Sequence, residues 1–468
     1  MPDKKLKKKI LSSCTLGAFI SPYMISSINV AIPHLGREFQ LSTSTMNWVV
    51  LSASLFMAVF ILPFGKLADI YGRKKFMLLG ISIFTLASLF CGLSVNIIML
   101  MAFRILQGAS AGMISVTSIS LLSSVYSREE RGRALGINVA ATYIGLSSGP
   151  FLGGFLTQYL GWRSLFFLVV PLGIILVILL SSFKQDWTDA KGEQFNFKGS
   201  LIYSSGLFGV VGGLSLIQYS WGLLMIFSGS ILIALFLFYE KRVKIPILDV
   251  NLLKNNRVLS FSSLAALINY SATFVIAYLL SLYLQYVKGL EPQQAGLVLI
   301  SQPLMQALFS PLAGSLSDRV EPQIVASSGM AITTIGLGLL IFLGENSSFL
   351  YIIFTLLIVG FGFALFSSPN TNAVMSSVSR RYYGVASGIL GSARTVGQAL
   401  SMAITSLVMV IYMGNISIGR DYHPGFLESV RVTFVILTIL CFLGIFASIA
   451  RGKIKVNKVK KVDTLLPD

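Results

Sequence analysis

Apolar runs long enough to cross a lipid bilayer follow one another along almost the whole chain. A transmembrane helix needs about 20 predominantly apolar residues. Fourteen runs of this kind lie near residues 10–33, 46–64, 76–95, 97–125, 134–157, 164–183, 200–218, 221–240, 258–284, 294–316, 322–343, 348–369, 384–412 and 429–450. Since 54% of the 468 residues are hydrophobic and only 12% are charged, the chain has too few polar side chains to cover a water-soluble surface. The sequence predicts an all-α, polytopic, multi-pass protein of the plasma membrane, with fourteen transmembrane helices in contact with lipid.

The first run follows a lysine-rich start, as in a secretory signal peptide. It continues to Pro33 without a small-residue cleavage site, so we expect a retained first helix. The three cysteines, Cys14, Cys91 and Cys441, lie inside apolar runs and lack metal-ligand spacing. They predict buried core positions, with no disulfide, metal or cofactor site.

The net charge of +18 would suit a nucleic-acid partner, but the positions of the basic residues indicate another cause. If the N-terminus is cytoplasmic, most of the 36 Lys and Arg residues fall in cytoplasmic segments. The segments on the other side hold Arg37, Arg163, Lys288 and Arg420. Positively charged loops tend to stay on the cytoplasmic side of a membrane. The asymmetry predicts that both termini are cytoplasmic, and no nucleic acid is needed to explain the charge.

Two short patterns recur at nearly equal offsets along the chain. Residues 65–69 (GKLAD) return as 314–318 (GSLSD), and residues 132–137 (GRALGI) return as 384–389 (GVASGI). Because membrane transport folds are often built by duplication, these matches predict two related halves. We expect an N-terminal six-helix bundle at 1–183, linkers with two inserted helices at 184–257, a C-terminal six-helix bundle at 258–450 and a basic cytoplasmic tail at 451–468.

Neither linker is long enough for a soluble domain, and the chain has no GxxxxGKS or GxxxxGKT phosphate loop. The sequence therefore argues against nucleotide as the energy source and against an enzyme. It also disfavours a sensor or scaffold, because such a protein would need a domain outside the membrane through which to signal.

Three glycine-rich motifs lie in the first half. Residues 65–75 read GKLADIYGRKK, residues 104–108 read RILQG, and residues 145–154 read GLSSGPFLGG. They resemble the loop 2–3, helix 4 and helix 5 signatures of the major facilitator superfamily, and the third is typical of its antiporters. With its fourteen helices, the chain resembles the fourteen-helix drug:proton antiporters of that superfamily over essentially its whole length. The resemblance implies the major facilitator fold and multidrug efflux.

The resemblance places Asp69 against the positive end of a helix in the other half when the cytoplasmic side is closed. A carboxylate in such a position gains roughly 0.3–1 kcal/mol. We expect Arg73 or Arg133 as a further partner of Asp69. The gate residues are then Gly65, Asp69, Gly72 and Arg73 and, in the second half, Gly314, Asp318 and Arg319. A solvated turn that only follows the charge rule is the alternative, but it does not explain the spacing of Gly, Asp, Gly and Arg.

Two arginines interrupt apolar runs. A guanidinium at the centre of a membrane helix costs about 3 kcal/mol, so Arg104 and Arg394 should face the bundle interior. The resemblance gives Arg104 a role in proton coupling. The alternative is a structural arginine bonded to carbonyl groups of the helices at 10–33 and 134–157.

Small residues in the run at 134–157 let this helix approach its neighbours, and its proline removes a backbone donor and bends it. The residues are Gly145, Gly149, Pro150, Gly153 and Gly154. We expect a dry seam between the halves that resists leak, as exchange requires. Close packing without a role in exchange is the alternative.

The first helix departs from the antiporter pattern, because Met24 stands where the drug:proton antiporters have aspartate. All 18 acidic residues fall at expected helix ends, in loops or in tails. Since a buried carboxyl can exchange a proton for a cationic substrate, this departure leaves carboxylate-based coupling without a candidate residue. Histidine side chains in general can change charge near neutral pH, but we expect His34 and His423 at the outer surface.

Aromatic, thioether and amide side chains are candidates for lining a substrate cavity, although helix packing uses the same residue types. The candidates are Met24, Asn29, Gln107, Tyr143, Asn269, Tyr270, Phe274, Tyr278, Gln302, Gln306, Asn370, Asn372 and Arg394. The sequence as a whole predicts a secondary transporter that exports hydrophobic or amphipathic drugs in exchange for protons by alternating access. The alternative is a facilitator or exchanger of a metabolite or anion, with Arg104 and Arg394 as the binding charges.

Overall fold

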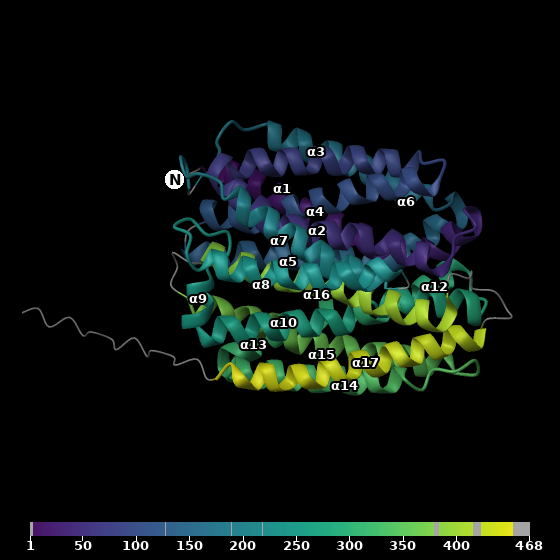
Figure 1. Ribbon diagram of the computed structural model, residues 1–468. Helices are drawn as coiled ribbons and strands as arrows, with labels where there is room; N and C mark the ends of the chain where they lie inside the picture. Colours follow the sequence, from purple (N-terminus) through teal and green to yellow (C-terminus); the bar gives the residue numbers. More distant parts are fainter. Residues whose placement is uncertain are drawn as a thin grey trace, which may run out of the picture.

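A computed structural model of the protein describes residues 3–126, 128–188, 190–217, 219–378, 383–414 and 423–452. Within these ranges every regular element is a helix (Figure 1). The elements are α1 (Lys4–Glu38), α2 (Thr43–Tyr71), α3 (Arg73–Gly92), α4 (Ile97–Val125), α5 (Arg128–Leu160), α6 (Arg163–Ser181), α7 (Phe197–Ser215), α8 (Ser220–Glu240), α9 (Val250–Asn255), α10 (Arg257–Thr273), α11 (Ile276–Leu282), the π-helical turn η1 (Tyr283–Val287), α12 (Pro292–Leu299), α13 (Ser301–Arg319), α14 (Pro322–Leu340), α15 (Phe349–Ser376), α16 (Tyr383–Met413) and α17 (His423–Ala450).

Thirteen of the described helical segments are long and apolar enough to cross a membrane. They coincide with thirteen of the predicted runs, so the all-helical, multi-pass fold is confirmed. The other predicted run, at 200–218, forms α7, whose 19 residues are rich in glycine and serine and therefore less apolar. The count of fourteen and the side of the membrane that holds the termini stay predictions.

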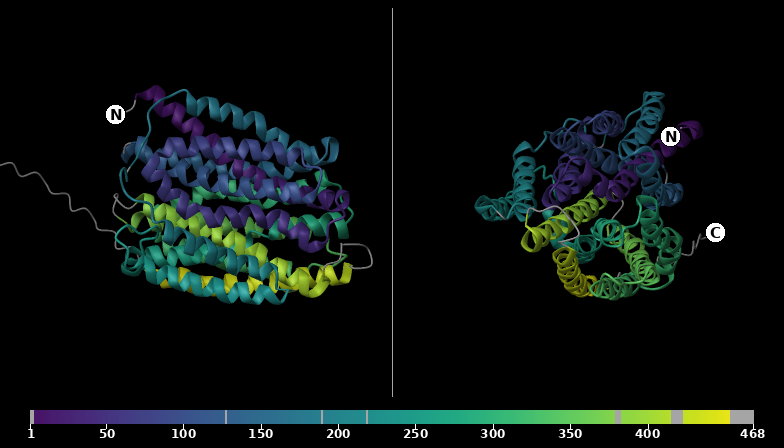
Figure 2. Two further views of the ribbon diagram at one scale, coloured as in Figure 1. Left: turned by 45° about the horizontal axis from the view of Figure 1, so that its top comes forward. Right: turned by 90° about the vertical axis from the view of Figure 1, so that its right-hand side faces the viewer.

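The helices from the first part of the chain, purple to blue, and those from the last part, green to yellow, form two groups (Figure 2). The two groups pack with the same internal pattern. In the first group α1 packs on α5, α2 on α4, and α3 on both α4 and α6. In the second group α10 packs on α16, α13 on α15, and α14 on both α15 and α17. The pattern agrees with the duplication inferred from the sequence. The domain boundaries at 183, 257 and 450 stay predictions.

In the pattern shared by residues 65–69 and 314–318, the glycine that begins each copy lies where two helices of its group meet. A Cβ at Gly65 would lie 3.0 Å from Val116 of α4, and one at Gly314 would lie 2.8 Å from the Ser368 hydroxyl of α15. Because a Cβ closer than about 3.4 Å forces its neighbour to move, both positions favour glycine.

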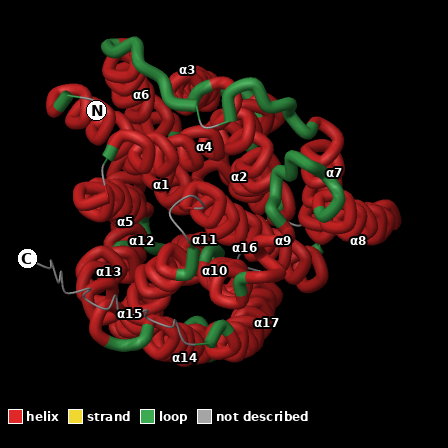
Figure 3. The backbone as a smooth tube through the Cα atoms, turned by 90° about the vertical axis from the view of Figure 1, so that its left-hand side faces the viewer, coloured by secondary structure: helices red, strands yellow, loops and turns green. Residues whose placement is uncertain are grey.

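The two groups meet along α2 and α16 on one side and along α5, α12 and α13 on the other. The inserted pair α7 and α8 lies beside the first of these seams, where α7 contacts both α2 and α16 (Figure 3). The Tyr203 hydroxyl donates to the Ala58 carbonyl at 3.0 Å, and the Ser204 hydroxyl donates to the Val59 carbonyl at 3.2 Å. These bonds fix the inserted pair to the first group.

The helix α1 begins and α17 ends at the same end of the bundle, where α2 also turns into α3 (Figure 1). We call this end the basic end, after the lysines that begin α1 and α3. The other end is called the opposite end.

Candidate functional site

Hydrogen bonds close the seam between the two groups at the opposite end. Tyr278 of α11 donates to the Asn47 side-chain oxygen in α2, and both residues are fully buried. The Gln285 amide donates to the Val30 carbonyl of α1 at 2.9 Å. Among the described residues, the hydrogen bonds that join the two groups lie mostly at this end. The opposite end is therefore closed in this structure.

The glycine motif of α5 forms two different contacts. A Cβ at Gly145, Gly149 or Gly153 would lie between 2.5 and 2.8 Å from atoms of α1. These three glycines therefore pack α5 onto α1 within the first group, where the sequence suggested the seam between halves.

Two other residues of this motif, Pro150 and Gly154, contact the second group. A Cβ at Gly154 would lie 2.4 Å from the Pro292 carbonyl of α12, and a Cβ at Gly296 would lie 2.1 Å from the Pro150 carbonyl of α5. The two helices thus touch backbone to backbone at these four residues. We call this contact the α5–α12 crossing.

A polar cluster lies between the groups, about midway along the helices. Tyr143 of α5 donates to the Ser367 hydroxyl of α15 at 3.1 Å. Arg394 of α16 donates to the Thr371 hydroxyl of α15 at 2.5 Å, and its guanidinium lies 5.7 Å from the centroid of the Tyr270 ring in α10. We call these five residues the central cluster. It brings together Tyr143, Tyr270 and Arg394, three of the residues that the sequence singled out.

The Arg394 guanidinium keeps unused binding capacity. Its Nε has no hydrogen-bond partner in the described part of the chain, and no described acidic side chain forms an ion pair with it. Placing such a cation in a membrane interior costs about 3 kcal/mol, of which one hydroxyl and one aromatic face recover only part. An electronegative group on a bound molecule would be stabilised here.

Arg104 lies inside the first group and is 2% exposed. Its Nε donates to the Val49 carbonyl of α2 at 3.2 Å, and its Nη1 donates to the Gln107 side chain, whose amide donates to the Ser88 hydroxyl of α3 at 2.8 Å. The carbonyl belongs to α2, whereas the structural alternative expected the first and fifth helices. The proton-coupling role stays a prediction.

The other cavity candidates are largely buried. Met24, Asn29, Gln302 and Asn370 are at most 9% exposed, and Phe274 is half-buried. Oxygen atoms of Asn29 and Asn370 and both amide atoms of Asn269 have no hydrogen-bond partner among the described residues. Since a buried polar atom without a partner costs about 1–3 kcal/mol, these amides can hold a water molecule or a substrate.

Three residues of these networks escaped the sequence reasoning: Asn47, Ser367 and Thr371. Asn47 and Ser367 are small polar residues inside predicted apolar runs, and Thr371 lies just after the run at 348–369. A polar residue in or beside an apolar run is a weak signal, because helices of this chain hold many serines and threonines bonded to their own backbone, such as Thr85 and Ser88.

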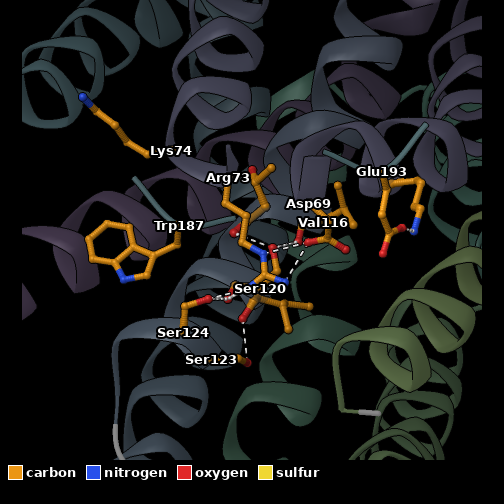
Figure 4. A network of polar contacts seen from close by, with 12 residues as sticks. Asp69, Arg73, Lys74, Val116, Ser120, Ser123, Ser124, Trp187 and Glu193 are labelled. Carbon is orange, nitrogen blue, oxygen red and sulfur yellow. Dashed lines mark hydrogen bonds and ion pairs between the residues drawn. The ribbon is translucent and has the colours of Figure 1, made fainter. Parts of the chain in front are cut away.

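The junction of α2 and α3, which we call loop 70–75, lies at the basic end and turns at Gly72 between the two helices. An ion pair spans it, from Asp69 near the end of α2 to Arg73, the first residue of α3. Arg73, 5% exposed, places Nη2 2.7 Å from the Asp69 carboxylate. It also donates to the Ser120 carbonyl at 3.3 Å and to the Ser124 hydroxyl of α4 (Figure 4). Asp69 is thus paired with Arg73, one of its two expected partners.

The other gate residues give less information. The side chains of Arg133 and Asp318 lie outside the described residues. Arg319 is exposed at the end of α13. Both gates stay predictions.

The family follows from a comparison with known families. The model of the Major Facilitator Superfamily matches residues 14–243 and 262–463. The chain belongs to the Major Facilitator Superfamily. The superfamily resemblance seen in the three motifs is thereby confirmed.

Relatives within the superfamily differ in what their names say they carry. The multidrug resistance protein Stp of Mycobacterium tuberculosis (strain CDC 1551 / Oshkosh) is 32% identical over 408 residues, which cover 85% of this chain and 75% of Stp. The riboflavin transporter RibZ of Clostridioides difficile (strain 630) is 28% identical over 449 residues, which cover 95% of this chain and 97% of RibZ.

A solved superfamily structure has the same fold. It is a bacterial homologue of the human lysosomal transporter Spinster in an inward-facing and unoccupied conformation. It matches with a TM-score of 0.68 and 18% identity, covering 96% of this chain and 98% of that chain. This match shows the fold, and the family match together with Stp shows that the protein is a transporter of the superfamily, in agreement with the sequence prediction.

Arg104→Gln tests whether this arginine is structural. The substitution removes the guanidinium bonds to the Val49 carbonyl and to the Gln107 side-chain oxygen. The Val49 carbonyl keeps the Ser52 hydroxyl as a donor, but the buried Gln107 oxygen loses its donor, which costs about 1–3 kcal/mol. We expect the thermal midpoint in detergent to fall by about 2–8 °C. Lys198→Gln, at an exposed lysine of α7, is the control and should leave the midpoint unchanged. An unchanged midpoint for Arg104→Gln, together with transport that no longer responds to pH, would favour proton coupling instead.

Proposed function

We propose that this transporter exports amphipathic organic compounds in exchange for protons, with the basic end in the cytoplasm. The central cluster carries the proposal. Tyr143 comes from the first group, and Tyr270, Ser367, Thr371 and Arg394 come from the second. A molecule bound among them touches both groups, so a rocking motion of one group against the other exposes it to alternate sides of the membrane.

The surroundings of the cluster support an amphipathic substrate. The ring of Tyr270 packs edge-on against Phe363 at 5.2 Å between centroids, which gives an aromatic surface beside the guanidinium. Buried amides such as Asn269 and Asn370 have unused hydrogen-bonding atoms within the same group. Apolar surface with a few polar groups is the usual composition of a binding site for such compounds. The multidrug resistance name of Stp points to the same substrate class.

The closed opposite end supports alternating access. If the basic end is cytoplasmic, as the basic residues predict, this arrangement corresponds to an inward-facing state. The antiporter-type motif at 145–154 supports exchange over simple diffusion. Since no acidic residue is expected near the middle of the membrane, we propose that proton coupling uses a group other than a central carboxylate, with Arg104 as the candidate.

The test uses purified protein in liposomes loaded with fluorescent amphipathic compounds, with and without an imposed pH gradient. We expect saturable flux that rises about threefold or more with the gradient and falls back when an ionophore collapses it. Saturable flux that ignores the gradient for every compound would overturn the exchange of protons. Flux equal to that of empty liposomes would overturn transport of this compound class.

The second candidate is a facilitator or exchanger of a metabolite or anion. Arg394 favours it, because the guanidinium has no acidic partner within the described chain. The match to RibZ also favours it, since it extends over nearly the whole of both chains. Flux of riboflavin or of an acidic aromatic compound that needs no proton gradient would support this candidate.

A further inference from the structure

The segment between α6 and α7 is bound across the loop that joins α2 and α3. We call its described residues, 182–188 and 190–196, the strap. The Arg73 amide donates to the Trp187 carbonyl at 3.0 Å, and the Ala190 amide donates to the Asp69 carbonyl at 3.1 Å. The strap thus bonds to the backbone of both partners of the Asp69–Arg73 ion pair (Figure 4).

Charged side chains extend this contact. Lys74 donates to the Phe183 carbonyl at 2.6 Å, and Lys66 forms an ion pair with Glu193 at 2.6 Å. The Lys66 side chain is only 19% exposed, so this pair is partly shielded from solvent. The strap is therefore attached on both sides of loop 70–75.

Asp186 of the strap caps the start of α3. Its carboxylate oxygens accept from the Lys74 amide at 2.8 Å and from the Lys75 amide at 3.2 Å. These are the second and third residues of α3, whose N-cap residue, Gly72, has no side chain to offer. The first amides of a helix need acceptors, and a carboxylate there also gains from the helix dipole. Asp186, more than a hundred positions away in the sequence, thus replaces the missing side-chain cap of α3.

Gly72 makes room for this carboxylate. A Cβ at Gly72 would lie 2.2 Å from Oδ2 of Asp186, and the backbone φ of Gly72 is 119°. Any other residue would meet both a steric clash and a strained backbone. The second glycine of the loop motif, which the sequence suggested as a gate residue, is therefore also the place where the strap docks.

The strap continues into the inserted helices. Asn196, the N-cap residue of α7, donates from its amide to Glu240 at 2.9 Å, and Glu240 is 2% exposed. Glu240 in turn accepts from the Ile247 and Leu248 amides that lead to α9. Since α7 contacts α16, a continuous set of contacts joins loop 70–75 to the second group.

We propose that Asp186 is a positioning residue of the transport cycle. Through its cap on α3 it couples loop 70–75, and with it the Asp69–Arg73 pair, to the inserted helices. Relative movement of the two groups at the basic end is thereby transmitted to the loop. This inference rests on the alternating-access function proposed above.

The variants are Asp186→Ala, Gly72→Ala and the two combined. Asp186→Ala should lower the maximal transport rate about fivefold, because losing an N-cap costs about 1 kcal/mol. The half-saturating substrate concentration should stay unchanged. Gly72→Ala should have a similar effect. In the combined variant the clash is absent, so the rate should be no lower than in the more affected single variant. If the rate of the combined variant falls by the product of the two single losses, the two residues act independently, and the docking of Asp186 at Gly72 is overturned.

Gly161→Ala is the matched control. Gly161 also has a positive φ, 77°, but a Cβ there would have no atom within 4 Å. It therefore measures backbone strain without a clash. A loss of rate in Gly161→Ala equal to that in Gly72→Ala would mean that strain alone explains the Gly72 result and would overturn the role assigned to the strap contact.

A second readout separates this inference from the proposed function. Gln293→Cys places a thiol at the seam of the opposite end, in place of the side chain that accepts a bond from Tyr159, and the native cysteines are all buried. The labelling of this single variant is the reference. Labelling by a membrane-impermeant maleimide should change about threefold or more in Asp186→Ala and stay unchanged in Gly161→Ala. If Asp186→Ala changes the labelling but the unmodified protein shows no flux, the proposed function is overturned and the role of the strap is supported. Normal flux with unchanged labelling would overturn the strap.

Discussion

Gly296→Ala is expected to slow transport about tenfold or more while leaving the protein folded. The added Cβ would lie 2.1 Å from the Pro150 carbonyl, a backbone atom that can move only with the whole of α5. Overpacking of this kind costs about 1–3 kcal/mol, and 1.4 kcal/mol is a factor of ten in a conformational equilibrium. The cost falls on the α5–α12 crossing, so it disfavours the state in which the opposite end is closed. The measurement is the initial rate of dye flux per reconstituted protein.

Gly136→Ala is the matched control for this prediction. Gly136 lies in α5, the other helix of the crossing, and a Cβ there would have no atom within 4 Å. Alanine also has the higher helix propensity, so this variant should be at least as stable as the unmodified protein. Equal flux in Gly296→Ala and Gly136→Ala would mean that the crossing opens freely during transport and does not limit it. Gel filtration and a thermal midpoint check that both variants remain folded.

The fold could be predicted from the sequence because its cause is local. Each apolar run specifies a helix by itself, since no other hydrogen-bonded segment is stable in lipid. The hydropathy signal is weakest for α7, because the glycines that let this helix pack against α8 also make it less apolar. A Cβ at Gly209 or Gly213 would lie within 3 Å of α8. Tertiary packing therefore supports a helix that its own composition marks only weakly.

The candidate site was predicted less completely, because its contacts join distant parts of the chain. Residue type and position were sufficient to select Tyr143 and Arg394, but not Thr371, which binds Arg394. Asp186 lies in the predicted linker region at 184–257, where the sequence does not distinguish it from the other acidic residues. Its partners, the amides of Lys74 and Lys75, carry no sequence signal, because every residue but proline has such an amide.

Arg394→Gln is expected to separate the two candidate substrate classes. A charge-assisted hydrogen bond from a guanidinium is worth about 1.5–3 kcal/mol, whereas a neutral amide provides about half of that or less. If an acidic group of the substrate binds Arg394, flux of a fluorescent carboxylate should fall about tenfold or more, and flux of its methyl ester should change little. Arg394→Lys should give an intermediate loss, because lysine keeps the charge but not the planar fork of donors. The measurement compares initial rates for the two compounds in the same liposomes.

The ratio of the two rates decides the outcome, since a general defect lowers both. Gly296→Ala provides that reference, because the α5–α12 crossing acts on both compounds alike and should leave their ratio unchanged. A ratio that stays the same in Arg394→Gln would mean that the guanidinium is held for structural reasons by Thr371 and Tyr270. The anion candidate would then lose its binding charge within the described chain. In that case the unpaired amides of Asn269 and Asn370 would remain to orient an uncharged amphipathic substrate.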